Sequence, residues 1–146
     1  MQLLLSLNLF STLAMVGLIW FVQIVHYPLL SIVGEDQFRA YMKQHRRLTS
    51  RVVGPLMLVE AFTSAGLLYQ PPAAGQVCWL WCGLGLVLVI WLSTACLQMP
   101  RHTALTDHGF SASHHTALVR TNRVRTLAWT ARGLLMTGLA CGPVSI

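Results

Sequence analysis

The chain has 146 residues, of which 55% are hydrophobic and only 10% are charged, and its mean hydropathy is +0.60. Such values exclude an ordinary soluble domain, in which about 25% of residues are charged. The formal net charge is +6 at pH 7, but basic residues also mark the cytoplasmic loops of membrane proteins and meet anionic lipid headgroups there. We therefore expect a membrane protein that contacts the lipid bilayer and binds no nucleic acid.

Four apolar stretches follow one another along the chain, at residues 3–25, 52–70, 77–99 and 126–146. Each is close to the length of about 20 residues that a membrane-spanning helix needs. The connections between them are too short to hold a second core. The sequence therefore predicts a single domain over residues 1–146, an all-α, membrane-embedded four-helix bundle with cytoplasmic helix extensions before the second and fourth spans.

Basic residues and histidines are confined to two segments, 25–51 and 99–125, which hold all six histidines and nine of the ten Lys and Arg residues. The connection at 71–76 has no basic residue. Because successive spans reverse direction and positive residues stay on the cytoplasmic side, we expect both segments in the cytoplasm and both termini outside. The expected location is the inner (plasma) membrane of a bacterium.

The two cytoplasmic segments differ in their patterns. Phe38, Met42 and His45 recur at helical spacing, which predicts an amphipathic helix that starts after Gly34 and runs into the second span. The other segment predicts a short irregular piece from Pro100 to Gly109. A helix then restarts near Ser111 or Ser113, either of which can cap its first turn, and continues into the fourth span.

Glu60 is the only acidic residue inside an apolar stretch. It lies eight residues beyond Val52, which is about 12 Å along a helix at 1.5 Å per residue, and Arg132 lies seven residues beyond Arg125, or about 10 Å. Both helices enter from the same side, so we expect Glu60 and Arg132 to face each other. One interpretation is a buried ion pair that only fixes helix register; the other is a catalytic carboxylate beneath a substrate cavity.

Further polar residues gather near the cytoplasmic end of every span. The candidate metal ligands are one histidine from each helix: His26, His45, His102 and His115. Imidazole, with the Glu60 carboxylate nearby, suits iron, copper or zinc, and two axial imidazoles would suit haem. Candidate cofactor-binding residues are Gln23, Tyr27 and Gln98. The candidate catalytic residues are Glu60, Arg132, Arg125 and Asn122, of which the last three share one helical stripe with His115 and Trp129, predicted to face the bundle interior.

The stretch 94–132 resembles the superfamily of small four-span membrane proteins that includes the fungal anthrone oxygenases. The shared pattern is Pro100, His102 and Leu105 after the third span, then Asn-x-x-Arg-Thr at residues 122–126. The resemblance implies a four-helix bundle and the oxidation of an aromatic or quinone-like substrate. The sequence departs from that pattern at residues 26–28, at His45 and at Glu60.

Three functions are compatible with these residues. The first is a membrane redox enzyme that binds a metal or haem through histidines and acts on a lipophilic small molecule entering between the helices. The second is a small proton-coupled transporter in which the Glu, Arg and His groups form a relay. The third is a non-catalytic membrane subunit or assembly factor. A homo-oligomer is compatible with each of them.

Overall fold

The computed structural model describes residues 1–142, and all its regular elements there are helical, which confirms the all-α prediction for that part of the chain. Four long helical segments follow one another. The first comprises α1 (Gln2–Phe21), the π-helical turn η1 (Val22–His26), α2 (Tyr27–Leu29) and the 3-10 turn η2 (Leu30–Ile32); the second is α3 (Glu35–Tyr69). After the short η3 (Ala74–Gln76), the third comprises α4 (Val77–Ser93), the π-helical turn η4 (Thr94–Gln98) and α5 (Met99–His108), and the fourth is α6 (Ala112–Cys141).

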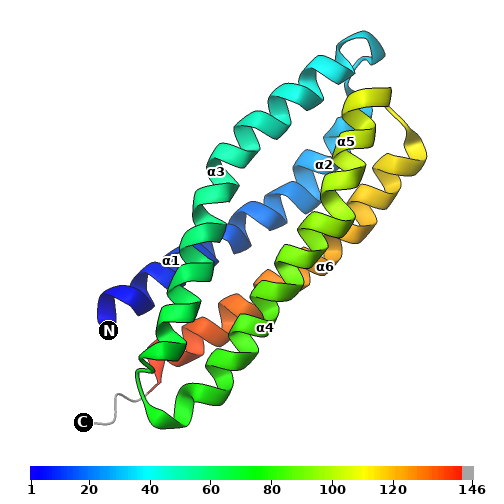
Figure 1. Ribbon diagram of the computed structural model, residues 1–146. Coiled ribbons are helices and arrows are strands. Elements are labelled where there is room, and N and C mark those ends of the chain that lie inside the picture. The colour runs from blue at the N-terminus through cyan, green and yellow to red at the C-terminus, as the bar shows by residue number, and fades with distance from the viewer. Residues whose placement is uncertain (143–146) are drawn as a thin grey trace.

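The four segments lie side by side and form an elongated molecule (Figure 1). The N-terminus, the α3–α4 connection and the end of α6 lie at one end, and the α2–α3 and α5–α6 connections lie at the other. Three segments are long and apolar enough to cross a membrane: Gln2–Ile32, Glu35–Tyr69 and Val77–His108. α6 is not among them over the described residues, and positions 143–146 of the predicted fourth span lie outside those residues.

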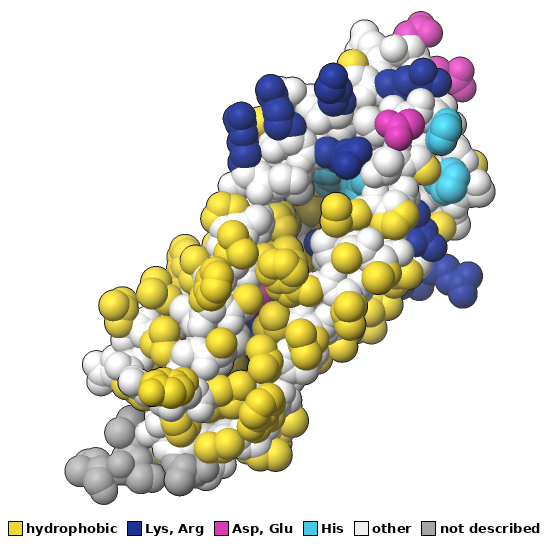
Figure 2. Space-filling view, in the orientation of Figure 1, with side chains coloured by type: hydrophobic (Ala, Val, Ile, Leu, Met, Phe, Trp, Pro, Cys, Tyr) yellow, Lys and Arg dark blue, Asp and Glu magenta, His cyan; other side chains and the backbone are white. Residues whose placement is uncertain are grey.

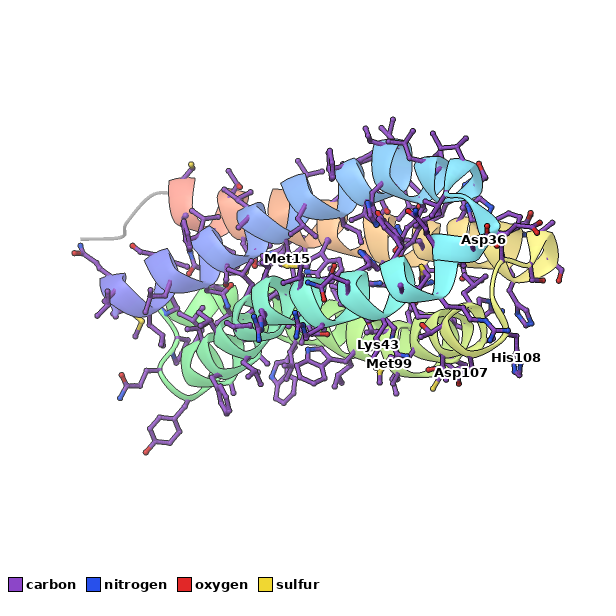
Figure 3. The ribbon with its side chains drawn as sticks, turned by 90° about the horizontal axis from the view of Figure 1, so that it is seen from above. Met15, Asp36, Lys43, Met99, Asp107 and His108 are labelled. Carbon is purple, nitrogen blue, oxygen red and sulfur yellow. The ribbon has the colours of Figure 1, made fainter. Side chains whose placement is uncertain are left out.

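Charge and hydrophobicity are segregated along this long axis. Figure 2 shows hydrophobic side chains over most of one face, with Lys, Arg, Asp, Glu and His side chains gathered toward the end that carries the α2–α3 and α5–α6 connections. Figure 3 agrees, since Asp36, Asp107 and His108 lie together at that end. The two polar segments of the sequence therefore do meet at one end of the molecule.

Helix starts follow the local sequence. α3 begins directly after Gly34 with Glu35 and Asp36 in its first turn, where negative charge favours the positive end of the helix. Ser111 caps α6 by accepting a hydrogen bond from the His114 backbone N–H at 3.5 Å. Both helices then continue without a break into their apolar halves, so the predicted helix extensions before the second and fourth apolar stretches are present.

The predicted irregular piece from Pro100 to Gly109 is wrong, because α5 is helical throughout. Pro100 is the second residue of α5, which continues directly from η4, so the helix passes through the proline without a break. The π-helical turn η4 comes directly before it, and η1 comes just before Pro28 in the same way. A π-helical turn widens the helix and so makes room for the proline ring, which otherwise collides with the carbonyl four residues earlier.

The central core joins all four helical segments. Met15 and Ile19 from α1, Met57 from α3, Ile90 from α4 and Trp129 from α6 are buried in one cluster. Met15 lies between the helices in the view from above (Figure 3). Polar clusters lie on both sides of this core along the molecule, one toward the termini and one toward the charged end.

Candidate functional site

A network of buried polar side chains, here called the deep network, connects α1, α3, α4 and α6 on the side of the termini. Its centre is an ion pair in which Arg132 Nε lies 2.8 Å from Glu60 Oε1, with both side chains almost fully buried. The sequence-based expectation that these two residues face each other is confirmed. The other members of the network are Asn8, Thr12, Thr63, Ser64, Trp129 and the carbonyl of Gly83.

Every nitrogen of the Arg132 guanidinium donates a hydrogen bond. Nε binds Glu60, Nη1 binds the Gly83 carbonyl oxygen at 2.6 Å, and Nη2 binds Asn8 Oδ1 at 3.0 Å and Ser64 Oγ at 2.6 Å. A buried charge is tolerated when it is paired and its remaining donors are satisfied. Four of the five N–H donors of the guanidinium are therefore used within the protein, and these bonds link three neighbouring helices to α6.

Both oxygens of the Glu60 carboxylate also accept hydrogen bonds. Oε1 accepts from Thr12 Oγ1 at 2.9 Å as well as from Arg132, and Oε2 accepts from Trp129 Nε1 at 3.1 Å. These donors occupy both oxygens of the carboxylate. This geometry favours a role of the ion pair in fixing how the helices pack.

A second cluster lies about 22 Å from Glu60 along α3, counting the fifteen residues back to His45 at 1.5 Å per residue. In it, the rings of His26, His45 and His102 come together from η1, α3 and α5, and these three residues are called the histidine cluster. The His26 and His45 ring centroids are 4.4 Å apart and stacked at 25°, and those of His45 and His102 are 5.6 Å apart. Tyr41 stacks parallel to His45 at 6.3 Å. Three of the four predicted ligands are therefore neighbours.

Each ring of the histidine cluster retains a nitrogen that is available to a ligand. His26 Nε2 and His102 Nδ1 are buried and have no hydrogen-bond partner. His45 Nδ1 lies 3.1 Å from Thr49 Oγ1, which leaves its Nε2. A buried polar atom without a partner costs about 1–3 kcal/mol, and this cluster holds two such atoms.

Tyr27 supports the histidine cluster through a hydrogen bond to His102. The Tyr27 hydroxyl lies 2.9 Å from His102 Nε2, so it holds the ring by the nitrogen opposite the free Nδ1. Ligating histidines are typically oriented in this way by a hydrogen bond to their second nitrogen. Arg125, buried on α6, lies near the Tyr27 hydroxyl and stacks 5.2 Å above the Trp129 ring. Trp129 thus contacts the deep network through Glu60 and also contacts Arg125, the neighbour of Tyr27.

Three amide side chains make hydrogen bonds that join η1 and η4 to α6. Asn122 donates to Gln23 Oε1 at 3.0 Å, Gln23 donates to the Val119 carbonyl at 3.2 Å, and Gln98 donates to Thr121 Oγ1 at 2.9 Å. The carbonyl oxygens of Asn122 and Gln98 and the Nε of Arg125 are buried without a partner. These unpartnered atoms add two acceptors and one donor to the free imidazole nitrogens.

His115, the fourth predicted ligand, lies apart from these rings. Its Nε2 is 2.7 Å from the Tyr27 carbonyl oxygen, and its ring packs 5.6 Å from Phe110. It supports the backbone of α2. His108 and His114 are exposed, as expected for solvated residues.

The rings are close but are not arranged around a common point. Over residues 1–142 no three His, Cys, Asp or Glu side chains are placed to hold a metal ion. The stacking explains this, because rings packed face to face present their nitrogens side by side. Binding an ion there requires rotation of the rings about their side-chain torsions.

Several members of the two clusters were missed from the sequence. Asn8 and Thr12 are spaced four residues apart in the first apolar stretch, so they share a face of α1, and that spacing was the available signal. Thr49 follows His45 by the same four residues.

No protein-family model, curated protein or solved structure significantly matches this chain.

Proposed function

We propose that the chain is an integral membrane metalloprotein of the oxidoreductase type, with its metal in the histidine cluster at the cytoplasmic end. Membrane insertion is supported by the three long apolar helical segments and by the segregation of charge to one end (Figure 2). Orientation is supported by the basic residues at that end, which favour the cytoplasmic side. In this arrangement α6, which carries the buried Arg132, is the fourth span.

The observation that carries the metal proposal is the set of free imidazole nitrogens on three adjacent rings. The ligands would be His26 Nε2, His45 Nε2 and His102 Nδ1, with Thr49 and Tyr27 holding the latter two rings. Three imidazoles are sufficient to bind iron, copper or zinc and leave a coordination position open. His115 is excluded from this set because its Nε2 already binds the Tyr27 carbonyl.

A single ion fits this site better than haem. Two axial imidazoles of a haem lie on opposite faces of the porphyrin, so their rings are separated by the macrocycle. His26 and His45 stack directly at 4.4 Å, and no porphyrin fits between them. A small ion requires only local ring rotation.

A bound iron or copper ion would supply one-electron chemistry to a lipophilic substrate that enters between the helices. The chain's own residues would position that substrate: the Arg125 guanidinium can donate to an oxygen, and the free carbonyl oxygens of Asn122 and Gln98 can accept from a hydroxyl or N–H. The resemblance to anthrone oxygenases makes an aromatic or quinone-like compound the first substrate to test. Glu60 and Arg132 would hold the helices together rather than react.

Proton-coupled transport is less well supported. A relay would require Glu60 to exchange protons with its surroundings, whereas its side chain is fully buried and both of its carboxylate oxygens are already hydrogen-bonded within the protein. A carrier would show pH-dependent flux in liposomes that Glu60→Gln abolishes. A non-catalytic subunit or assembly factor would copurify with a partner protein and bind no metal of its own.

The proposal is tested by the metal content of protein purified in mild detergent from cells grown with added iron, copper and zinc. We expect about one iron or copper ion per chain, and we expect His45→Ala to remove it. His114→Ala, at an exposed position, is the matched control and should retain the ion. Helical circular dichroism and gel-filtration elution show whether each variant is folded. A wild-type protein that stays free of metal, or a folded His45→Ala variant that keeps its ion, would contradict the proposal.

A further inference from the structure

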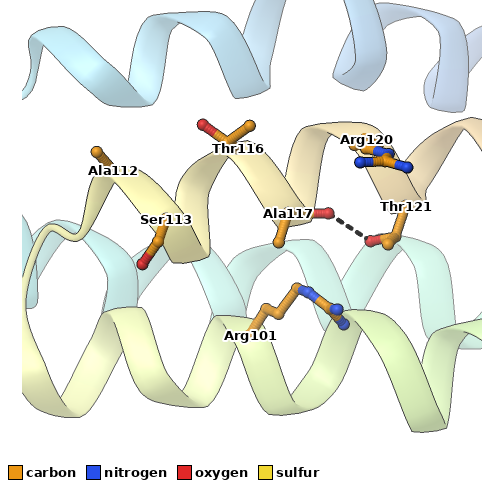
Figure 4. Close-up of a pocket in the computed structure, with 7 residues that line it drawn as sticks. All are labelled: Arg101, Ala112, Ser113, Thr116, Ala117, Arg120 and Thr121. Atoms are coloured by element: carbon orange, nitrogen blue, oxygen red, sulfur yellow. Dashed lines mark hydrogen bonds between the residues drawn. The ribbon is translucent and has the colours of Figure 1, made fainter.

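A basic groove runs between α5 and α6 at the charged end of the molecule, outside both polar clusters. Its volume is about 660 Å³. Arg101 from α5 lies across the groove from the α6 residues Ala117 and Thr121, and Arg120 lies beside them (Figure 4). The hydroxyls of Ser113 and Thr116 and the first turn of α6 line the same groove.

The two guanidinium groups of the groove have no acidic partner. Arg132 with Glu60 is the sole ion pair between side chains of residues 1–142. Arg101 donates through one nitrogen to the Leu97 carbonyl oxygen at 2.6 Å, which fixes its side chain along α5. Its remaining donors and those of Arg120 are available to an anion, and the N-terminal turn of α6 adds a partial positive charge.

The groove lies at the level of lipid headgroups if the apolar stretches lie in the bilayer. Arg101 is two residues beyond the third apolar stretch, and Arg120 is six residues before the fourth, which is about 3 Å and about 9 Å along the helices. The polar headgroup layer on each side of a bilayer is about 5–8 Å thick. Both arginines are therefore close to the phosphates of the cytoplasmic leaflet.

The same face of α6 turns apolar toward the membrane centre. Val124 and Leu127 follow Arg120 by four and seven residues, so they lie below it on one helix face. They are 42% and 66% exposed. Basic residues above an exposed apolar stripe match the two parts of a phospholipid. The arginines lie at the depth of the headgroup, and the apolar stripe lies at the depth of the acyl chains.

A second basic groove lies on the other side of α6. It has a volume of about 480 Å³ and shares Thr116 and Arg120 with the first. Arg123 and His115 also line it. The surface around Arg120 is thus positive on both sides of α6.

We propose that the groove between α5 and α6 binds the phosphate of an anionic glycerophospholipid from the cytoplasmic leaflet. Arg101 and Arg120 clamp the phosphate oxygens, and the acyl chains lie along Val124 and Leu127. The inference depends on the membrane insertion proposed above and is independent of the metal site. A lipid held there would brace α5 against α6 next to His102 and Gln98.

The test is native mass spectrometry of the full-length protein, released from detergent in the presence of phosphatidylglycerol or phosphatidylcholine. We expect a phosphatidylglycerol adduct whose dissociation constant rises at least about tenfold in the double variant Arg101→Gln/Arg120→Gln, because two charge-assisted hydrogen-bonding groups are lost. Phosphatidylcholine should bind weakly to both proteins. Arg47→Gln/Arg51→Gln removes the same charge from α3 and serves as the control, which should bind phosphatidylglycerol as the wild type does.

Three outcomes would overturn the inference. Equal phosphatidylglycerol binding by the wild type and the groove variant excludes the groove, and equal losses in the groove and control variants indicate only general charge attraction. Displacement of the lipid by inorganic phosphate at similar concentration indicates a site for a free anion. If the double variant fails to fold, Arg120→Gln alone, at an exposed position, should still weaken binding. Metal content is measured alongside, because its loss in a variant that still binds lipid would concern only the metal site.

Discussion

At the level of single residues, the two polar clusters differ in how completely their atoms are bonded. In the deep network, the charged atoms of Glu60 and Arg132 all have partners. Of the seven buried side-chain atoms without a partner in residues 1–142, five belong to the histidine cluster and the residues around it: His26, Gln98, His102, Asn122 and Arg125. Buried polar groups are normally satisfied in a finished core. The polar atoms of the first cluster are therefore satisfied within the protein, whereas the second cluster and its surroundings retain atoms without a partner.

Tyr27 tests whether the histidine cluster is a prepared ligand set. Tyr27→Phe removes the hydroxyl that holds His102 Nε2 and leaves all three proposed metal ligands in place. Loss of such an outer hydrogen bond typically lowers metal affinity about 10–100-fold. Competition against a chelator of known affinity measures this change. An unchanged affinity would show that Tyr27 does not orient a ligand.

The deep network predicts strong energetic coupling between Glu60 and Arg132. Removing one partner of a buried ion pair costs about 3–5 kcal/mol, so we expect that loss of unfolding free energy for Glu60→Gln and for Arg132→Gln. The double variant should cost clearly less than the two single losses added together. Denaturant titration in detergent micelles measures all three. Single losses below about 1 kcal/mol would place the pair in the range of exposed ion pairs and contradict this account.

The sequence was sufficient to pair Glu60 with Arg132. Each residue lies a similar distance along its helix from the start of its apolar stretch, and both helices enter from the same side of the bundle. The histidines were harder to place. Ring stacking and the position of His115 depend on side-chain torsions and on the path of α2, and neither follows from residue spacing. Asn8 and Thr12 lie in an apolar stretch without a charged residue, so little beyond their four-residue spacing distinguishes them in the sequence.

At the level of whole elements, two of the helical segments around the histidine cluster contain a π-helical turn, whereas His45 and His102 themselves lie in regular α-helices. η1 holds Gln23 and His26, and η4 holds Gln98. A π-helical turn inserts one extra residue per turn and so rotates the following side chains relative to a regular α-helix. Pro28 and Pro100 indicate irregular backbone in the sequence. The sequence does not indicate that a π-helical turn before each proline keeps the first and third helical segments continuous.

Two glycines of α4 make a matched pair for testing the contact with Arg132. A Cβ at Gly83 would lie 3.0 Å from Arg132 Nη1, whereas a Cβ at Gly85 would meet nothing within 4 Å. Gly83→Ala should therefore lower the unfolding free energy by about 1–3 kcal/mol through overpacking. Gly85→Ala should leave it unchanged or raise it by up to about 1 kcal/mol through helix propensity. Equal effects of the two substitutions would show that α4 does not approach Arg132 closely.

At the level of the whole molecule, the architecture was the most predictable feature. Composition and four apolar stretches were sufficient for an all-α chain, and the confinement of basic residues to alternate connections placed them at one end. The exact helical path beyond each apolar stretch was less predictable, as the continuous α5 illustrates. A proline-containing segment can stay helical where the preceding turn makes room for the ring, as η4 does before Pro100.

Topology gives a prediction for the intact cell. In a variant whose four cysteines are replaced by alanine, a new cysteine at Ala73 should react with a membrane-impermeant maleimide from outside the cell. A new cysteine at the exposed Thr103 should react only after the membrane is permeabilised. The reverse pattern would place the histidine cluster on the outer side, and labelling of both positions without permeabilisation would contradict a membrane-spanning arrangement.

The central claim is that three histidines from three helices hold one metal ion. Anomalous X-ray diffraction from crystals of the metal-loaded protein tests it most directly, with data collected above the absorption edge of the bound metal. We expect a single peak about 2 Å from one nitrogen each of His26, His45 and His102. A loaded protein whose anomalous peak lies elsewhere, or one with no peak among these rings, would contradict the claim.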